Sequence, residues 1–158
     1  MAIDSGNIIE FFGTQDTVSA GGGTSAVVDA AYSASGDAAA WTNDDDAELA
    51  TFVLTFQYPS GTIDTNGIQL FARLMNIDGT ADEPQPGSGF EEHFLGSFPT
   101  DSGLAATTDN SVSLGYNVEL PNMYTSQVYE FYVKNNCGVT MTAGWTLKIT
   151  PKAKGQRA

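Results

Sequence analysis

The chain has 158 residues, 19 of them acidic and six basic, which gives a formal net charge of −13 at pH 7. Binding to the phosphates of DNA or RNA needs a clustered basic surface, so this balance argues against a nucleic-acid partner. The length fits one domain that needs no disulfide or structural metal for its stability. The single cysteine, Cys137, cannot form an internal disulfide.

The sequence also argues against a membrane partner. No run approaches the ~18 apolar residues that a membrane span needs, and the first residues lack the basic and apolar regions of a secretory signal. We therefore expect the protein to be made and used in solution.

Alternation of apolar and polar residues with a period of two dominates the chain and predicts strands with one buried face. Short strands are predicted near the N-terminus over residues 8–12, 25–31 and 38–42. Residues 49–58 predict a longer strand, which stops at the turn signal Pro59-Ser60-Gly61. Residues 68–75 are nearly all apolar and predict a central strand buried on both sides, in which Arg73 needs a carboxylate or carbonyl partner.

In the C-terminal part, a short strand over residues 93–98 precedes the cleanest alternation, over residues 111–120. We interpret residues 127–150 as a β-hairpin, with a first strand at 128–133 and a second at 139–150. The residues Asn135-Asn136-Cys137-Gly138 tolerate positive φ angles and predict the turn between them.

These elements predict an all-β fold, a two-sheet antiparallel β-sandwich of jelly-roll or Greek-key type with about eight or nine strands and extended N- and C-terminal arms. The Ala-rich segment 27–40 is the one rival for a helix, but serine and glycine interrupt it and leave room for a single turn. We expect residues 1–24 to form an N-terminal arm with a first strand, residues 25–150 the sandwich and residues 151–158 a basic tail.

No recognised catalytic motif is present, neither a GxSxG elbow nor a phosphate-binding glycine loop nor an HExxH pair. A Cys–His nucleophilic site would have to use His93 and Cys137, because each is the single residue of its type. We interpret His93 as a strand-end residue and Cys137 as a small turn residue. The sequence therefore predicts no enzymatic activity, no catalytic, cofactor-binding or metal-ligating residues, and no cofactor.

Two acidic segments are candidate cation sites. Residues 76–83 place oxygen donors around Gly79 in the manner of a calcium loop, but the spacing departs from that of an EF-hand, and a turn capped by Asp78 explains the string as well. The sequence leaves calcium at this loop open. We interpret Asp44, Asp45 and Asp46 as a solvated acidic loop before a strand.

Aromatic side chains raise the alternative of a carbohydrate-binding or receptor-binding module, since exposed rings stack on sugars. Trp145 and Tyr116 are in phase with aliphatic neighbours, which predicts that they fill the core. Trp41, Tyr124 and Tyr129 are less constrained and are candidates for a ligand or subunit contact.

Charge is segregated along the chain, because every acidic residue precedes residue 131 while four of the six basic residues lie in the last eleven positions. A short cationic end can dock on an acidic neighbour. We therefore name the predicted interface residues as Lys148, Lys152, Lys154 and Arg157. The alternative is a solubilising end without a partner.

Residues 40–152 resemble a family of small β-rich bacteriophage structural proteins. The resemblance is carried by the stretches FARLMNIDGT at 71–80, HFLGSF at 93–98, YEFYVKNN at 129–136 and AGWTL at 143–147. It implies a virion component assembled in the host cytoplasm, a decoration or cement protein on the capsid exterior. The implied partners are the major capsid protein and the protein itself, as a homodimer or homotrimer. No functional residue is carried over. Under the alternative, the binding module would belong to a phage tail or fibre.

Overall fold

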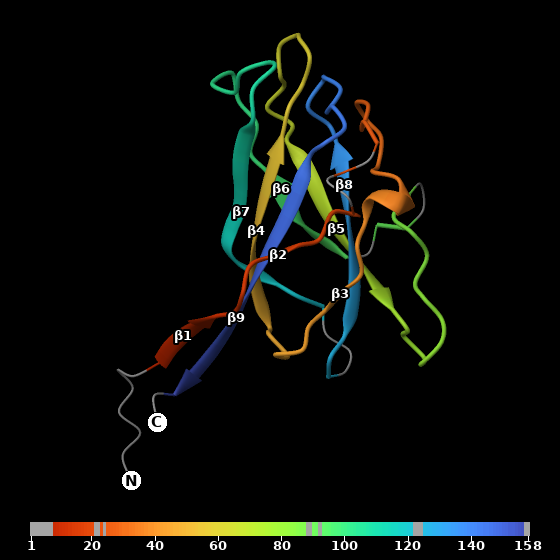
Figure 1. The fold of residues 1–158 in the computed structure, drawn as a ribbon, viewed down its shortest axis with the longest axis vertical. Helices are drawn as coiled ribbons and strands as arrows, with labels where there is room; N and C mark the ends of the chain where they lie inside the picture. The colour runs from red at the N-terminus through yellow and green to blue at the C-terminus, as the bar shows by residue number, and fades with distance from the viewer. Residues whose placement is uncertain are drawn as a thin grey trace.

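The computed structural model describes residues 8–20, 23, 25–87, 90–91, 93–121 and 125–156. Two β-sheets pack face to face, and the first and last described strands leave at the same end of the sandwich (Figure 1). A 3₁₀ turn lies at Ser35–Asp37, within the Ala-rich segment 27–40 for which the sequence left room for a single turn. None of the described helical structure is long and apolar enough to cross a membrane.

Nine strands make up the described part of the two sheets. In chain order they are β1 Ile8–Phe12, β2 Asp16–Thr17, β3 Trp41–Thr42, β4 Leu49–Phe56, β5 Ile68–Met75, β6 Phe94–Phe98, β7 Asn110–Glu119, β8 Val128–Asn135 and β9 Thr146–Gln156.

The strands pair as a nested set. β5 pairs with β6, β4 with β7, β3 with β8 and β2 with β9, all antiparallel, so the chain is one long hairpin whose tip is the β5–β6 connection. Pairing of β9 with β4 and of β8 with β5 rolls this hairpin into two sheets, in the orders β2-β9-β4-β7 and β3-β8-β5-β6. That arrangement is an eight-stranded jelly roll, which confirms the predicted sandwich.

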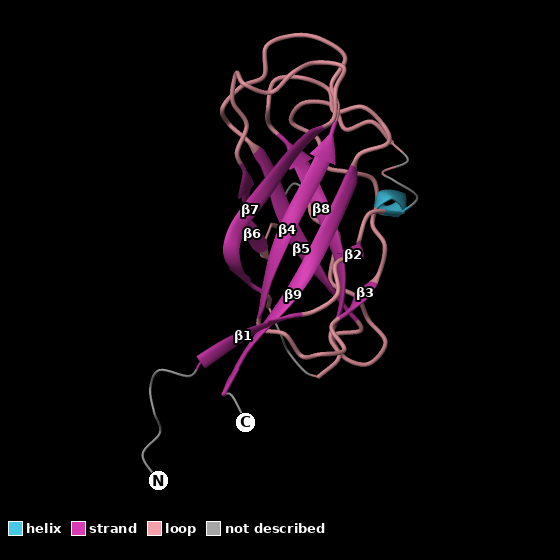
Figure 2. Cartoon of the chain, turned by 60° about the vertical axis from the view of Figure 1, so that its left-hand side comes forward, coloured by secondary structure: helices cyan, strands magenta, loops and turns pink. Residues whose placement is uncertain are grey.

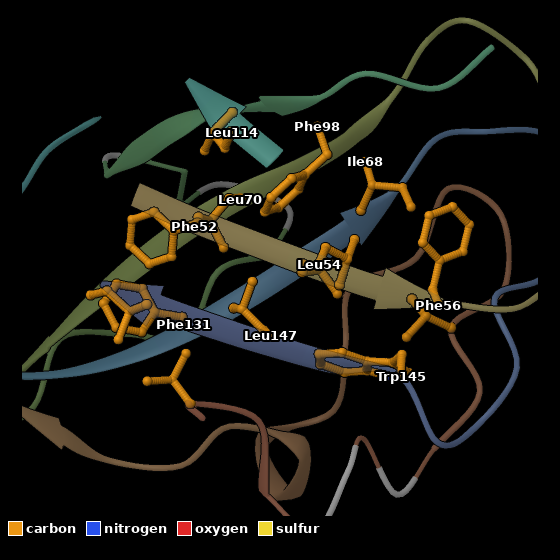
Figure 3. Close-up of a cluster of buried hydrophobic side chains, with 14 of the residues drawn as sticks. Phe52, Leu54, Phe56, Ile68, Leu70, Phe98, Leu114, Phe131, Trp145 and Leu147 are labelled. Atoms are coloured by element: carbon orange, nitrogen blue, oxygen red, sulfur yellow. The ribbon is translucent and has the colours of Figure 1, made fainter. Parts of the chain in front are cut away.

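Alternating side chains of both sheets fill the space between them (Figure 3). Along β4, the inward residues Phe52, Leu54 and Phe56 are at most 1% exposed, while the residues between them are half-buried. The ring of Phe52 meets that of Phe131 from the opposite sheet edge-on, with centroids 5.1 Å apart. Such aromatic pairs add stability beyond the apolar area they bury.

Trp145 closes one end of this core. Its indole nitrogen donates to the Ser25 carbonyl at 3.1 Å, and its ring packs on Gly23. A Cβ atom at Gly23 would lie 2.5 Å from the indole ring, and the glycine has a φ of +56°, so only glycine fits this position without strain. The prediction that Trp145 fills the core is confirmed.

The predicted hairpin over residues 127–150 is wrong. β8 pairs with β3 and β5, whereas β9 pairs with β1, β2 and β4, so the two strands lie in opposite sheets. Residues 136–145 cross the edge of the sandwich rather than making a turn within one sheet. The buried amide of Asn135 holds this crossing by donating to the carbonyls of Val27 and Val139 at 2.8 and 2.6 Å.

Other predicted strands differ mainly in their ends. Residues 8–12 and 68–75 form β1 and β5 with the predicted bounds. The predicted strand at 25–31 is reduced to one isolated bridge between Val27 and Met141, and the one at 38–42 to the two residues of β3. β9 begins later than predicted and continues to Gln156, so residues 151–156 form a strand.

We predict that Phe52→Ala lowers the free energy of unfolding by about 3–5 kcal/mol, because the side chain is fully buried and its loss leaves a cavity between the sheets. Urea unfolding followed by tryptophan fluorescence measures the change. Ser113→Ala on the exposed side of β7 is the control and should shift stability by less than about 0.5 kcal/mol. Equal losses in the two variants would contradict the assigned core.

Candidate functional site

The two ends of the described chain form a ribbon that leaves the sandwich. β9 pairs with β4 as far as the pair Leu49–Lys152, and beyond it residues 153–156 pair with β1. Figure 2 shows β1 and the end of β9 extending away from the packed sheets together. We call β1 with residues 152–156 the terminal ribbon.

Two phenylalanines are exposed on the terminal ribbon. The side chains of Phe11 and Phe12 are 51% and 64% exposed, and because they are adjacent in a strand they lie on opposite faces of the ribbon. The ammonium group of Lys152 lies 5.1 Å from the centre of the Phe12 ring, a cation–π contact. The ribbon therefore has apolar surface on both faces.

A groove of about 320 Å³ lies at the base of the terminal ribbon. Asp45 and Lys152 are the charged residues of its lining. Its other lining residues are Phe11, Phe12, Gly13, Ala47, Pro151 and Ala153. The groove is thus of mixed polarity, with one acidic and one basic residue.

Three of the four predicted interface residues lie on β9. Lys148 is exposed, whereas Lys152 is only 5% exposed and its ammonium group contacts the Phe12 ring. Lys154 occupies the position opposite Glu10 in the ribbon, and Arg157 lies outside the described residues. The three described positions follow one strand. Their role in binding stays a prediction.

Lys148 stands on a sheet face of uncharged side chains. It is opposite Val53, between the cross-strand pairs Thr51–Thr150 and Thr55–Thr146. Ser111 and Ser113 of β7 extend this face, and the Ser111 hydroxyl lies 2.9 Å from that of Thr55. This outer face of β9, β4 and β7 carries a cation and hydroxyl groups in a chain that is otherwise strongly acidic.

The outer face of the other sheet carries an ionic cluster around Arg73. Its guanidinium donates to Glu130 Oε2 at 2.8 Å and to the Glu83 carbonyl at 2.6 Å, and Asp82 lies 3.6 Å away. The requirement of Arg73 for a carboxylate or carbonyl partner is therefore met by both. Burial acts to lower the pKa of Arg73, but the hydrogen bond and charge of Glu130 outweigh it and raise the pKa.

Glu130 also accepts a hydrogen bond from the Tyr132 hydroxyl, at 2.7 Å. Burial, with the adjacent carboxylate of Glu130, raises the pKa of Tyr132 well above its ordinary value of about 10. The phenol is thus held neutral and serves as a donor. The cluster fixes two strands of the sheet through the cross-strand pair Arg73–Glu130.

Glu83 and His93 attach the loop between β5 and β6 to this cluster. The Glu83 carboxylate accepts from the Leu74 amide at 2.8 Å and lies 2.9 Å from His93 Nε2. His93 directly precedes β6, as the sequence predicted. Both side chains are engaged in holding the loop on the sheet.

Amide groups of the candidate calcium loop bond to its own carboxylates. Asp78 accepts from the amides of Thr80 and Ala81 at 2.9 and 2.5 Å, and these bonds lower the pKa of its carboxyl group. Asp82 accepts from the Asn76 amide at 3.0 Å. No group of three or more His, Cys, Asp or Glu side chains within the described residues is arranged to hold a metal ion. A capped turn accounts for this segment.

No described contact joins His93 to Cys137. Asn135 Oδ1 accepts from the backbone amide of Cys137 at 3.1 Å and lies 2.7 Å from its sulfur, and the residue is buried. Burial raises the pKa of the thiol, which disfavours the thiolate that nucleophilic catalysis needs. The arrangement is that of a packed residue at the crossing between the sheets.

The proposed freedom of Trp41 and Tyr129 for a ligand is wrong. Trp41 is 8% exposed and Tyr129 is fully buried, with its hydroxyl donating to the Pro121 carbonyl. Both pack against Phe131 in the core. Tyr124 and the side chain of Tyr116 lie outside the described residues. The rings named for sugar stacking are thus unavailable where the structure describes them.

The sequence reasoning missed Phe11 and Phe12. The signal was present, because two adjacent phenylalanines in a strand lie on opposite faces, and at an edge only one face can meet the core. The groove beside them was not predictable, since it joins the ends of the chain to Asp45, which precedes β4.

Comparison with known proteins adds little. No protein-family model matches the chain, and no curated protein does. Two solved structures of infectious bursal disease virus align with it, the Gt strain at 14% identity and a TM-score of 0.29 and the Gx strain at 16% and 0.30. The alignments cover 91% and 97% of this chain but only 32% and 37% of those chains. TM-scores this low do not define a shared fold and leave the function open.

We predict that the stability of the protein falls at alkaline pH in part through Tyr132. Because its folded pKa lies above the unfolded value of 10, its contribution is full below pH 10 and is lost as the pH rises further. For one proton the slope is at most about 1.4 kcal/mol per pH unit. Urea unfolding across this range should show a shallower fall for Tyr132→Phe. An equal fall of the unfolding free energy with pH in both proteins would contradict the raised pKa of Tyr132.

We predict that the thiol of Cys137 reacts with Ellman's reagent more than about a hundredfold more slowly in the native protein than in urea, since labelling needs local or global opening. Asn135→Ala, which removes the amide that holds the crossing, should speed native labelling. A native thiol that reacts as fast as the unfolded one would restore the case for a nucleophile.

Proposed function

We propose that this chain is a non-enzymatic structural protein of a virion. In this proposal it is a decoration or cement protein that binds the exterior of the capsid and bridges neighbouring copies of the major capsid protein. It also associates with copies of itself. The resemblance of residues 40–152 to small bacteriophage structural proteins is in accord with this role.

The nested jelly-roll topology is the observation that carries the proposal. Jelly rolls recur in viral capsid domains, as they do in lectins and cupins, because closing two sheets on one core gives a stiff unit with short edges. A fold by itself does not assign a function. The choice among these roles therefore depends on the surfaces of the sandwich.

Those surfaces favour binding over catalysis. The titratable side chains gathered on one sheet, among them Arg73, Glu83 and Glu130, are bonded to one another and hold the fold. The opposite sheet offers a face of hydroxyl groups around Lys148, and the chain ends leave as the terminal ribbon. A stiff body that has one weakly cationic face, rich in hydroxyl groups, and a protruding pair of strands suits attachment to a larger acidic surface.

We predict that particles purified from the source of this sequence contain the chain in a fixed ratio to their major shell protein, measured by quantitative mass spectrometry. Particles stripped with mild denaturant should rebind the recombinant chain to the same ratio. Presence only in the soluble fraction, or binding that never saturates, would contradict the proposed function.

The same rebinding experiment tests Lys148. Lys148→Glu should weaken binding about tenfold at low salt, with a smaller effect at high salt, because an exposed charge is screened. Lys148→Arg keeps the charge and is the matched control. Identical binding by all three proteins would remove Lys148 from the interface.

A further inference from the structure

The terminal ribbon is a sheet fragment with open edges. Among the described strands, β1 pairs with β9 alone, and residues 153–156 of β9 lie beyond the last pair with β4. A two-stranded ribbon is at best marginally stable in water, and independent stability takes three or more strands. The ribbon therefore lacks the neighbour that would complete it.

The backbone of β1 presents a regular row of donors and acceptors at its outer edge. The Gly13 amide donates to the Pro151 carbonyl at 2.9 Å, next to the pair Phe12–Lys152. Since bonded and non-bonded pairs alternate in an antiparallel ladder, Ile9 and Phe11 bond to β9. Ile8, Glu10 and Phe12 then direct their amide and carbonyl groups to the open edge, where another strand can pair.

The base of the ribbon carries residues of both charge signs. Each chain has a net charge of −13, so contact between copies through acidic regions is unfavourable. The lining of the groove beside Phe11 and Phe12 includes one acidic residue, Asp45, and one basic residue, Lys152. A two-fold contact needs a patch that complements itself, and a patch with apolar rings and one residue of each charge sign meets that condition.

We propose that two copies of this chain pair β1 against β1, antiparallel across a two-fold axis. The two ribbons then form one four-stranded sheet, in which the exposed rings of Phe11 and Phe12 gain cross-strand neighbours from the second copy. The inference rests on the proposed structural role, in which copies assemble, and names the surface and symmetry of that assembly. Its test needs no particle.

The test compares two substitutions at Glu10 in the full chain. Proline at this position removes the amide that faces the open edge but none that bonds to β9, and edge strands tolerate proline there. Glu10→Pro should therefore weaken the dimer at least tenfold while leaving the monomer folded. Glu10→Ala makes the same charge change, keeps the amide and should still dimerise.

Sedimentation velocity over a range of concentrations gives the mass and the dissociation constant, and circular dichroism with urea unfolding confirms that each variant folds. Phe12→Ser is a second variant, expected to weaken the dimer by removing the apolar contact. A wild-type monomer at every concentration, a trimer, or a dimer that Glu10→Pro leaves intact would overturn the inference. A β1-dependent dimer that is missing from particles would support the inferred pairing and contradict the proposed function. A monomer that still loads onto particles would contradict the pairing and support the proposed function.

Discussion

The contact between the inward side chains of β4 and β8 organises the molecule. Phe52 from one sheet meets Phe131 from the other, and Tyr129 stacks beside it, so the sheets are joined at the centre by rings that adopt defined relative orientations. Each strand contributes every second residue to this layer, and a shift of one residue in any strand would expose its apolar set. The register of both sheets thus follows from one shared core, and loops and chain ends are placed by it.

The outer faces of the two sheets carry different kinds of polar side chain. On the sheet of β5 and β8, Arg73 and Glu130 lie on a face that loops cover, and a charge in that position persists only with its partners in place. On the sheet of β4 and β9, half-buried threonine pairs carry no charge and need no ionic partner. The charged side chains of one face are thus bonded to one another and hold the fold, whereas the other face carries uncharged hydroxyl groups.

The alternation of apolar and polar residues predicted where the strands lie but not which strands pair with each other. Alternation reports that one face of a strand is buried, which is equally true whether the next strand lies in the same sheet or in the opposite one. Residues 127–150 alternate as a hairpin does, yet β8 and β9 lie in opposite sheets. β2 has two exposed residues and no signal of its own. For the site, the sequence marked Lys148 and Lys152 alike, and only the fold separates the exposed side chain from the buried one, which contacts Phe12 far away in the sequence.

The terminal ribbon is a consequence of the nested topology rather than an addition to it. In a hairpin rolled from its tip, the first and last strands are partners, so the two chain ends must leave side by side. If they stop at the edge of the sandwich, the sheet has a short edge that needs no neighbour. Here β9 runs past the end of β4 and carries β1 with it, placing Phe11 and Phe12 where their own core cannot reach them. Apolar rings and unpaired backbone groups on one projecting element are most simply satisfied together, by a strand from outside the chain.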